Sequence, residues 1–293
     1  MDDKLLFVQF PHPGGEHGKD LQGWKCWNRG EHKRKFLKRP GRYVGGRGVQ
    51  ELLFWGEWEP GSRVQRIERR DDDGPRFIHE PCYVVPESYE GLQNTDPFVF
   101  CKEFLYGMCK QPTFCQLGRL APGSVILFGS CKDNGFALDT VFVVGTRPPV
   151  DHSSAKELEG WVCKEYFEVT VNPWYRNFGK GKACAAASPQ KCRLYFGACP
   201  DNKVHGMYSF FPCCRYEENS RGFARPKIDL EIDGKQVVNP NKSAGVKFTR
   251  LGLDGMKSLW DKVVEKVKNE HLEIGVYAET PERCSHSPCS GRR

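Results

Sequence analysis

The 293-residue sequence is 39% hydrophobic and 28% charged, with 44 Lys and Arg residues against 37 Asp and Glu residues. This composition excludes a disordered chain. It also excludes a transmembrane helix, because no apolar run approaches the ~20 residues that one needs. The net charge of +7 permits binding to a polyanion and fits a mildly basic enzyme equally well.

The N-terminus begins acidic and lacks the basic region and long apolar segment of a signal peptide. We therefore expect a cytoplasmic protein that does not enter membranes, in which most of the 14 cysteines are free, buried thiols. Their spacings match no standard zinc module, although Cys184, Cys192 and Cys199 with His205 offer an alternative zinc site. We expect no structural disulfide, no metal and no cofactor.

The first half of the chain is rich in β-branched and aromatic residues, which predict strands over 5–10, 51–58, 76–85, 124–130 and 136–145. Asn134 and Gly135 between the last two segments favour a tight hairpin turn, because both tolerate positive φ. The apolar runs on either side predict a hairpin buried on both faces. The carboxylate of Asp139 inside this hairpin needs polar partners.

A polar stretch over 146–160 predicts a boundary between an N-terminal part, 1–150, and a C-terminal part, 151–279. The C-terminal part ends in a helix over 254–270, capped by Asp254, with Trp260 in its apolar stripe. The tail over 280–293 is polar, and we expect it to be mobile. The remaining apolar segments predict strands over 161–171, 192–198, 207–211, 227–232, 246–251 and 272–278.

These elements predict a strand-rich α+β protein, either a curved mixed sheet or a β-barrel with a few packed helices. Pro122 and Gly123 precede the apolar run over 124–128. This motif resembles the PUA-like group of domains, which includes ASCH, EVE and YTH relatives. The resemblance extends over about 51–145 and implies a fold that cups a flipped or modified base.

Two polar motifs precede the second predicted strand. His12 and His17 flank two glycines in a loop after the first strand, where a ligand can approach the backbone or an ordinary turn can form. Asn28 follows Trp27, and a basic run begins at His32. This run is either a solvated face or a phosphate-binding surface made of Lys33, Arg34, Lys35, Lys38 and Arg39.

Two further motifs place carboxylates among rings and amides. In a strand, Trp55, Glu57 and Glu59 point to one face and Trp58 to the other. Glu57 is therefore an acid or base beside aromatic rings, unless it pairs with an arginine of the basic run. Asp96 and Asn94 lie before an apolar segment, where they either form a turn or contact a ligand.

We expect the pocket where the loop after the first strand, the 51–58 strand and the 93–97 turn converge. Asp96 or Glu57 would activate water or stabilise charge, Asn28 and Asn94 would orient a sugar or base, and Trp55 or Trp58 would stack on it. His12 and His17 complete this set. The sequence contains no P-loop, GxGxxG, HExxH or GxSxG motif, which disfavours several enzyme classes.

Together, the Pro-His-Pro-Gly-Gly-Glu-His, Trp-Asn, Trp-Gly-Glu-Trp-Glu and Asn-Thr-Asp-Pro runs resemble an uncharacterised bacterial family. They are similar to anti-phage DNA glycosylases that excise glucosylated hydroxymethylcytosine. This resemblance implies a hydrolase that flips a modified base out of double-stranded phage DNA. The alternatives are a non-catalytic reader of modified nucleic acid and an enzyme acting on a nucleotide or other small polar ligand.

Overall fold

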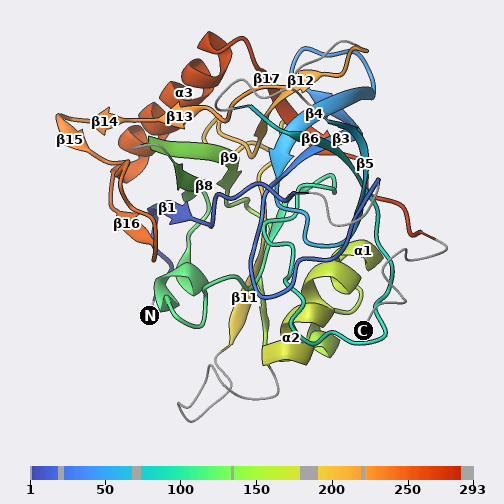
Figure 1. The fold of residues 1–293 in the computed structure, drawn as a ribbon. Helices are drawn as coiled ribbons and strands as arrows, with labels where there is room; N and C mark the ends of the chain where they lie inside the picture. The colour runs from blue at the N-terminus through green and yellow to red at the C-terminus, as the bar shows by residue number, and fades with distance from the viewer. Residues whose placement is uncertain are drawn as a thin grey trace.

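Strands make up most of the regular structure in a computed structural model that describes residues 2–18, 23–67, 74–132, 135–178, 191–218 and 222–284 (Figure 1). They form two large mixed sheets, a three-stranded sheet and a two-stranded sheet. Helices are few and lie outside the sheets. The predicted strand-rich α+β class is confirmed.

The first large sheet has the order β13-β9-β8-β1-β16, with β1 parallel to β8 and the other pairs antiparallel. Its centre is the predicted hairpin of β8 and β9, in which Ile126 lies opposite Phe142. The turn residues 133–134 lie outside the described residues. The strands of this sheet are β1 (Phe7–Pro11), β8 (Val125–Lys132), β9 (Gly135–Val143), β13 (Lys227–Ile228) and β16 (Lys247–Thr249).

Both faces of this sheet are buried, as the sequence predicts. Leu127 and Val143 belong to one apolar cluster, whereas Ile126 and Phe142 belong to another. The alternation follows from the two-residue period of a strand, which sends neighbouring side chains to opposite faces. The hairpin therefore separates two cores.

The second large sheet has the order β17-β12-β4-β3-β6-β5-β2, and an additional pairing of β17 with β3 closes a small four-stranded barrel. Closure brings backbones very close, since a Cβ at Gly41 would lie 2.3 Å from the carbonyl oxygen of Tyr277. The strands are β2 (Trp24–Lys25), β3 (Lys35–Tyr43), β4 (Gln50–Gly56), β5 (Ser62–Ile67), β6 (Phe77–Pro81), β12 (Phe211–Arg215) and β17 (Glu273–Ala278).

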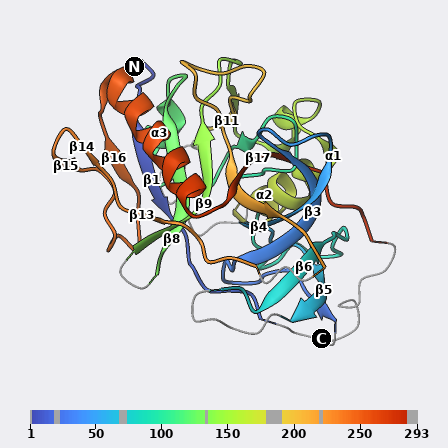
Figure 2. The same cartoon turned by 90° about the horizontal axis from the view of Figure 1, so that it is seen from above.

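Helix α3 (Gly252–Asn269) covers one face of the first sheet (Figure 2). Its buried stripe includes Trp260, whose ring nitrogen donates a hydrogen bond to the carbonyl oxygen of Tyr208. The helix and its apolar stripe are confirmed. Asp254 lies in the first turn rather than at the N-cap, because the helix begins two residues earlier than predicted.

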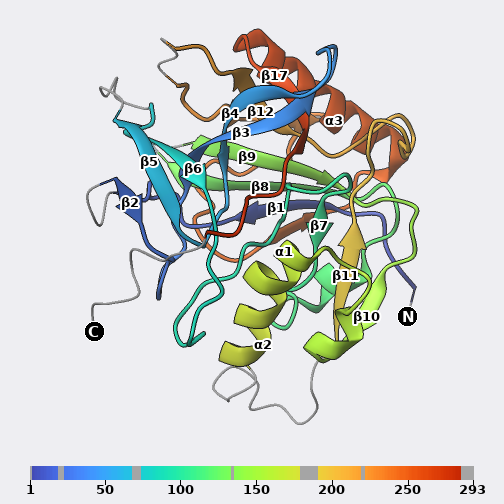
Figure 3. The same ribbon diagram turned by 90° about the vertical axis from the view of Figure 1, so that its right-hand side faces the viewer.

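A second group of helices replaces the strand predicted over 161–171. α1 (Lys164–Tyr166), a π-helical turn (Phe167–Val171) and α2 (Asn172–Phe178) run consecutively. The buried positions in this segment recur at helical spacing, and the β-branched residues did not override that packing. These helices lie beside the three-stranded sheet of β10 (Val150–His152), β11 (Cys192–Phe196) and β7 (Leu105–Tyr106), on the side of the molecule away from α3 (Figure 3).

The remaining short elements are 3-10 turns over Cys115–Arg119 and Ala155–Leu158 and a two-stranded ribbon of β14 (Glu231–Ile232) and β15 (Lys235–Gln236). Both large sheets combine strands from before and after residue 150. Of the predicted tail, residues 280–284 are described, and the amide of Cys284 donates a hydrogen bond to Tyr83. Residues 285–293 lie outside the described residues.

Eleven cysteines of the described part are free. Cys26 is disulfide-bonded, so the expectation of no disulfide is wrong at this position. Cys184 of the alternative zinc site lies outside the described residues, while Cys192 and Cys199 are buried and form no disulfide. Within the described residues, no helix is long and apolar enough to cross a membrane.

Candidate functional site

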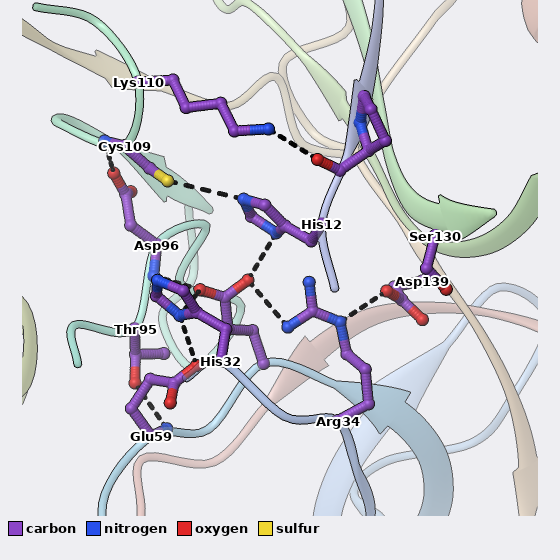
Figure 4. A network of polar contacts seen from close by, with 12 residues as sticks. His12, His32, Arg34, Glu59, Thr95, Asp96, Cys109, Lys110, Ser130 and Asp139 are labelled. Carbon is purple, nitrogen blue, oxygen red and sulfur yellow. Dashed lines mark hydrogen bonds and ion pairs between the residues drawn. The ribbon is translucent and has the colours of Figure 1, made fainter. Parts of the chain in front are cut away.

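Three segments meet at one buried network: the loop after β1, the end of β4 and the turn before β7 (Figure 4). They bring His12, Glu57 and Asp96 together. The Nδ1 atom of His12 lies 2.8 Å from Oε2 of Glu57, and the backbone amide of Asp96 donates to Oε1 of Glu57 at 3.5 Å. The structure thus joins the three segments that the sequence places around a pocket.

Glu57 is a buried carboxylate held by other side chains. Its Oε2 lies 3.1 Å from Nη1 of Arg34 as well as next to His12, and its Oε1 lies 3.6 Å from Nδ1 of His32. Burial alone would raise the pKa of Glu57, but His12 and Arg34 lower it to about 2. Glu57 is therefore ionised at neutral pH in a site from which water is largely excluded.

Glu59 forms a second anionic position beside the first. Its Oε1 lies 2.8 Å from Nδ1 of His32, and its Oε2 accepts a hydrogen bond from the side-chain amide of Asn28. Burial lowers the pKa of His32, but the nearby carboxylates of Glu59 and Glu57 outweigh this effect and raise it. His32 is 21% exposed, so it connects the buried carboxylates to solvent.

A chain of ion pairs runs from Glu57 to the β8–β9 hairpin. Arg34 contacts Glu57 with one nitrogen and Oδ2 of Asp139 with another, at 2.8 Å. Arg225 lies 3.2 Å from Oδ1 of the same aspartate and donates to the hydroxyl of Ser130 at 2.7 Å. The partners that Asp139 needs inside the hairpin are thus two buried arginines.

Asp96 is held by the backbone rather than by side chains. Its Oδ2 accepts hydrogen bonds from the amides of Met108 at 2.7 Å and Cys109 at 2.8 Å, and its Oδ1 accepts one from Gly107 at 3.0 Å. Burial raises the pKa of Asp96 to about 7, while these three N–H donors act in the opposite direction. Because both oxygens are engaged, this carboxylate fixes the 107–109 segment and has little capacity to activate water.

The segment that Asp96 fixes presents Cys109 to His12. The Sγ atom of Cys109 lies 3.4 Å from Nε2 of His12, on the opposite side of the ring from Glu57. Burial lowers the pKa of His12 to about 4, so the imidazole is neutral at pH 7. Burial also raises the pKa of the Cys109 thiol well above its usual value. The side-chain amine of Lys110 donates to the carbonyl oxygen of Pro11.

The alternation predicted for the end of β4 is present. Glu57 and Glu59 both contact His32, whereas Trp58 points away and packs on Phe100 in the core. Trp58 is fully buried, so it offers no surface on which a base could stack. Trp55 packs instead on Phe36 and lines a separate cavity.

The basic run does not form one phosphate-binding surface, because it leads into strand β3 and two of its central cations are buried. Arg34 and Lys35 are 1% and 0% exposed, and the amine of Lys35 donates to the carbonyl oxygen of Pro60. The prediction that these two contact a phosphate backbone is therefore wrong. The alternative that an arginine of this run pairs with Glu57 is confirmed.

The other members of the run remain at least partly accessible. Lys33 is 41% exposed next to His32. Lys38 lies 3.9 Å from Glu51 and over the ring of Tyr216, and Arg39 donates to backbone carbonyls at 279 and 280. Of these three cations, Lys33 lies nearest in sequence to the network.

The remaining predicted residues divide into two groups. Asn28 and Asn94 are buried, and one polar side-chain atom of each has no hydrogen-bond partner among the described residues. Both can therefore still contact a ligand. His17 lies apart from His12, near Lys35 and His79, and burial followed by the charge of Lys35 lowers its pKa. His17 does not join the network in Figure 4.

One group of described residues could hold a metal ion. His32, Glu57 and Glu59 each offer one ligand atom, and these atoms lie within 4.8 Å of one another. A nitrogen and two carboxylate oxygens suit zinc or manganese. Because His32 has a raised pKa, a metal would have to displace a proton from it.

Sequence reasoning assigned no role to His32, Glu59, Cys109 or Arg225. Two signals point to the first two: His32 begins the basic run, and Glu59 shares the alternation of Glu57. Cys109 and Arg225 carry no local signal, because each reaches the network from a segment far away in the chain.

Comparison of the chain with known protein families, with curated protein sequences and with solved structures found no match in any of the three.

Proposed function

We propose that this protein is a DNA glycosylase, a hydrolase that cuts the N-glycosidic bond of a modified base in double-stranded phage DNA within the cytoplasm. The observation that supports it best is the ionised, buried Glu57, which is held mainly by side chains. Hydrolysis of an N-glycosidic bond passes through an oxocarbenium-like sugar, and a fixed negative charge in a water-poor site stabilises it.

The partners of Glu57 are suited to this role. Glu57 and Glu59 are two carboxylates of the network, and Arg34 has a second anionic partner in Asp139. Glu57 can therefore give up part of its contact with Arg34 and face the positive charge that develops on the sugar. Within the described part of the chain, the side-chain oxygen of Asn28 has no hydrogen-bond partner and could orient the sugar or base. His32 and Lys33 mark the edge at which the network meets solvent, where an extruded nucleotide would enter.

The test uses duplexes that contain either glucosylated hydroxymethylcytosine or cytosine, followed by alkaline cleavage at abasic sites. We expect the protein to produce abasic sites in the modified duplex. Glu57→Gln should reduce the rate roughly 1000-fold with binding retained, because the charge acts on the transition state. Glu51→Gln, on the strand β4 that leads to Glu57, is the matched control, since the Glu51 side chain is 44% exposed and contacts Lys38.

Other outcomes separate the alternatives. Selective binding to the modified duplex without abasic sites would replace the glycosylase by a reader of modified nucleic acid. Failure both to bind and to cut either duplex would overturn both proposals, and would favour an enzyme acting on a small polar ligand.

A specific arrangement supports that last alternative. Cys109, His12 and Glu57 lie in the order nucleophile, base and orienting carboxylate, with contacts of 3.4 and 2.8 Å. The glycosylase needs no thiol, so Cys109→Ser should keep its abasic-site activity. Loss of abasic-site formation in Cys109→Ser would contradict a mechanism that depends on Glu57 without the thiol.

A further inference from the structure

A cavity of about 270 Å³ lies behind the Glu57 network, on the far side of Asp139. We call it the Trp55 cavity; its wall includes Gly14, Gly15, Trp55, Arg76, Phe77 and Arg225. Glycines and alanines make up much of the remaining lining, so a ligand can approach the backbone closely.

The cavity is basic. Arg76, Arg225 and Lys227 line it, and Glu16 is its one acidic residue among those described. The carboxylate of Glu16 already accepts hydrogen bonds from the backbone amides of Arg76 at 2.7 Å and Phe77 at 3.1 Å. The charge of the wall therefore favours an anionic ligand.

Arg225 is a preorganised anion-binding group in this wall. Its guanidinium lies 5.1 Å from the centroid of the Trp55 ring, and it donates to Ser130, Asp139 and the carbonyl oxygen of Gly14. A guanidinium carries five N–H donors, so two remain after these three bonds within the described residues. Arginine held in this way binds the oxygens of phosphate in a fixed geometry.

The cavity is also connected to the candidate catalytic carboxylate. Arg225 contacts Asp139, Asp139 contacts Arg34, and Arg34 contacts Glu57, at 3.2, 2.8 and 3.1 Å. A negative charge bound to Arg225 would compete with Asp139 for that arginine. Binding in the cavity would thus alter the partners of Arg34 and, through it, those of Glu57.

We propose that the Trp55 cavity binds the phosphate of a nucleotide unit of the substrate, with Arg225 and Arg76 contacting the phosphate and the rings of Trp55 and Phe77 contacting the sugar or base. This inference rests on the proposed function for the identity of the substrate. The volume of the cavity exceeds that of a phosphate ion alone, and its two aromatic rings suit the less polar part of a nucleotide.

Calorimetric titration with deoxycytidine monophosphate, deoxycytidine and inorganic phosphate tests the proposal without requiring activity. We expect the monophosphate to bind, with affinity falling as salt rises, and deoxycytidine to bind at least tenfold more weakly. Inorganic phosphate binding as tightly as the monophosphate would reassign the cavity to a free-phosphate site. Absence of binding by all three, or equal binding of deoxycytidine and its monophosphate, would overturn the proposal.

Two variants keep the test interpretable. Arg76→Ala removes an exposed cation and should weaken monophosphate binding about tenfold without affecting folding. Arg225→Lys keeps the charge but removes the planar donors, and should weaken binding further. Arg250→Ala, at an exposed position outside the cavity, is the matched control. Unchanged affinity in both cavity variants would contradict the assignment.

The outcomes also separate this proposal from the glycosylase. If Arg76→Ala and Arg225→Lys bind the monophosphate normally while the wild type still makes abasic sites, the cavity assignment fails and the glycosylase stands. If the monophosphate binds through Arg225 but no duplex yields abasic sites, the cavity assignment stands and the glycosylase fails.

Discussion

Two carboxylates lie in one buried network, yet different groups hold them. Asp96 is surrounded by backbone N–H groups of Gly107, Met108 and Cys109. Glu57 is surrounded mainly by side chains, principally those of His12 and Arg34. Both carboxylates are buried. They differ in how easily the groups that hold them can move.

The mobility of their partners indicates different roles for the two carboxylates. Backbone donors cannot leave Asp96 unless the 107–109 segment loses its conformation, whereas side chains around Glu57 can change partners when a substrate arrives. Arg34 already has a second anionic partner in Asp139. For the proposed glycosylase we therefore favour Glu57 as the reacting carboxylate and Asp96 as a structural one, where the sequence left both open.

The largest expected effect is on the free energy of unfolding, which tests the different roles of Asp96 and Glu57. Asp96→Asn should lower the free energy of unfolding by about 3 kcal/mol, because the amide would point an N–H donor at backbone donors. Glu57→Gln should lose about half as much, since Arg34 keeps Asp139. Urea unfolding followed by tryptophan fluorescence measures both. A larger loss in Glu57→Gln would reverse the assignment.

The next largest expected effect is a loss of folding stability at acidic pH. Burial lowers the pKa of His12 to about 4, of His79 to about 3 and of His152 to about 4. The unfolded chain takes up protons at these histidines below about pH 6.5, and the folded chain does not. The stability they provide is therefore complete above pH 6.5 and is lost as the pH falls towards 4.

Asp96 changes the folding stability with pH in the direction opposite to that of the histidines. With its pKa raised to about 7 from 3.8, the folded state binds a proton that the unfolded state releases, so stability falls as pH rises through this range. Removing this opposing contribution in Asp96→Asn should steepen the loss of stability between pH 7 and 4. Parallel pH profiles for Asp96→Asn and the wild type would mean that the backbone donors keep Asp96 ionised throughout.

The metal content of the purified protein tests whether Glu57 acts as a free carboxylate or as a metal ligand. We expect no stoichiometric metal in the purified protein and no effect of EDTA on abasic-site formation, because the raised pKa of His32 favours a protonated ring. Elemental analysis by mass spectrometry checks this. One zinc per chain, lost in His32→Ala, would make His32, Glu57 and Glu59 a metal centre instead.

The smallest expected effect concerns DNA affinity. Lys33→Ala should weaken duplex binding less than tenfold and reduce the slope of the salt dependence by about 1, as for one lost phosphate contact. Lys266→Ala on α3 is the control, because the Lys266 side chain is 44% exposed and pairs with Glu270 of the same segment. Equal affinity and salt slope for the Lys33 variant and the wild type would place the DNA elsewhere.

Sequence reasoning succeeded where the pattern was local. The β8–β9 hairpin, helix α3 and the opposite orientation of Glu57 and Trp58 all follow from periodicity within one segment. The convergence of His12, Glu57 and Asp96 was inferred from three polar motifs at the ends of predicted strands.

It failed where burial depends on distant partners. The charge pattern of the basic run predicts a position at the surface, but Lys35 pairs with the end of β4, Arg34 bridges Glu16, and both side chains are buried. Arg34 can be buried because Asp139 lies opposite it, 105 positions later in the chain. The helices over 164–178 differ from the predicted strand for a related reason. The β-branched residues of this segment favour a strand locally, and the helix is selected because its buried positions pack on the core.

The pairing of β1 with β16 has a consequence for how the protein is made. Phe7 in β1 pairs with Thr249 in β16, which is synthesised much later. The barrel likewise closes only after β17 has been synthesised and pairs with β3. At ribosomal rates of about 5–20 residues per second, β1 waits roughly 10–50 s for its second partner. During that interval its edge and apolar side chains lack their final cover, which makes the emerging chain a natural client for chaperones that shield exposed strands.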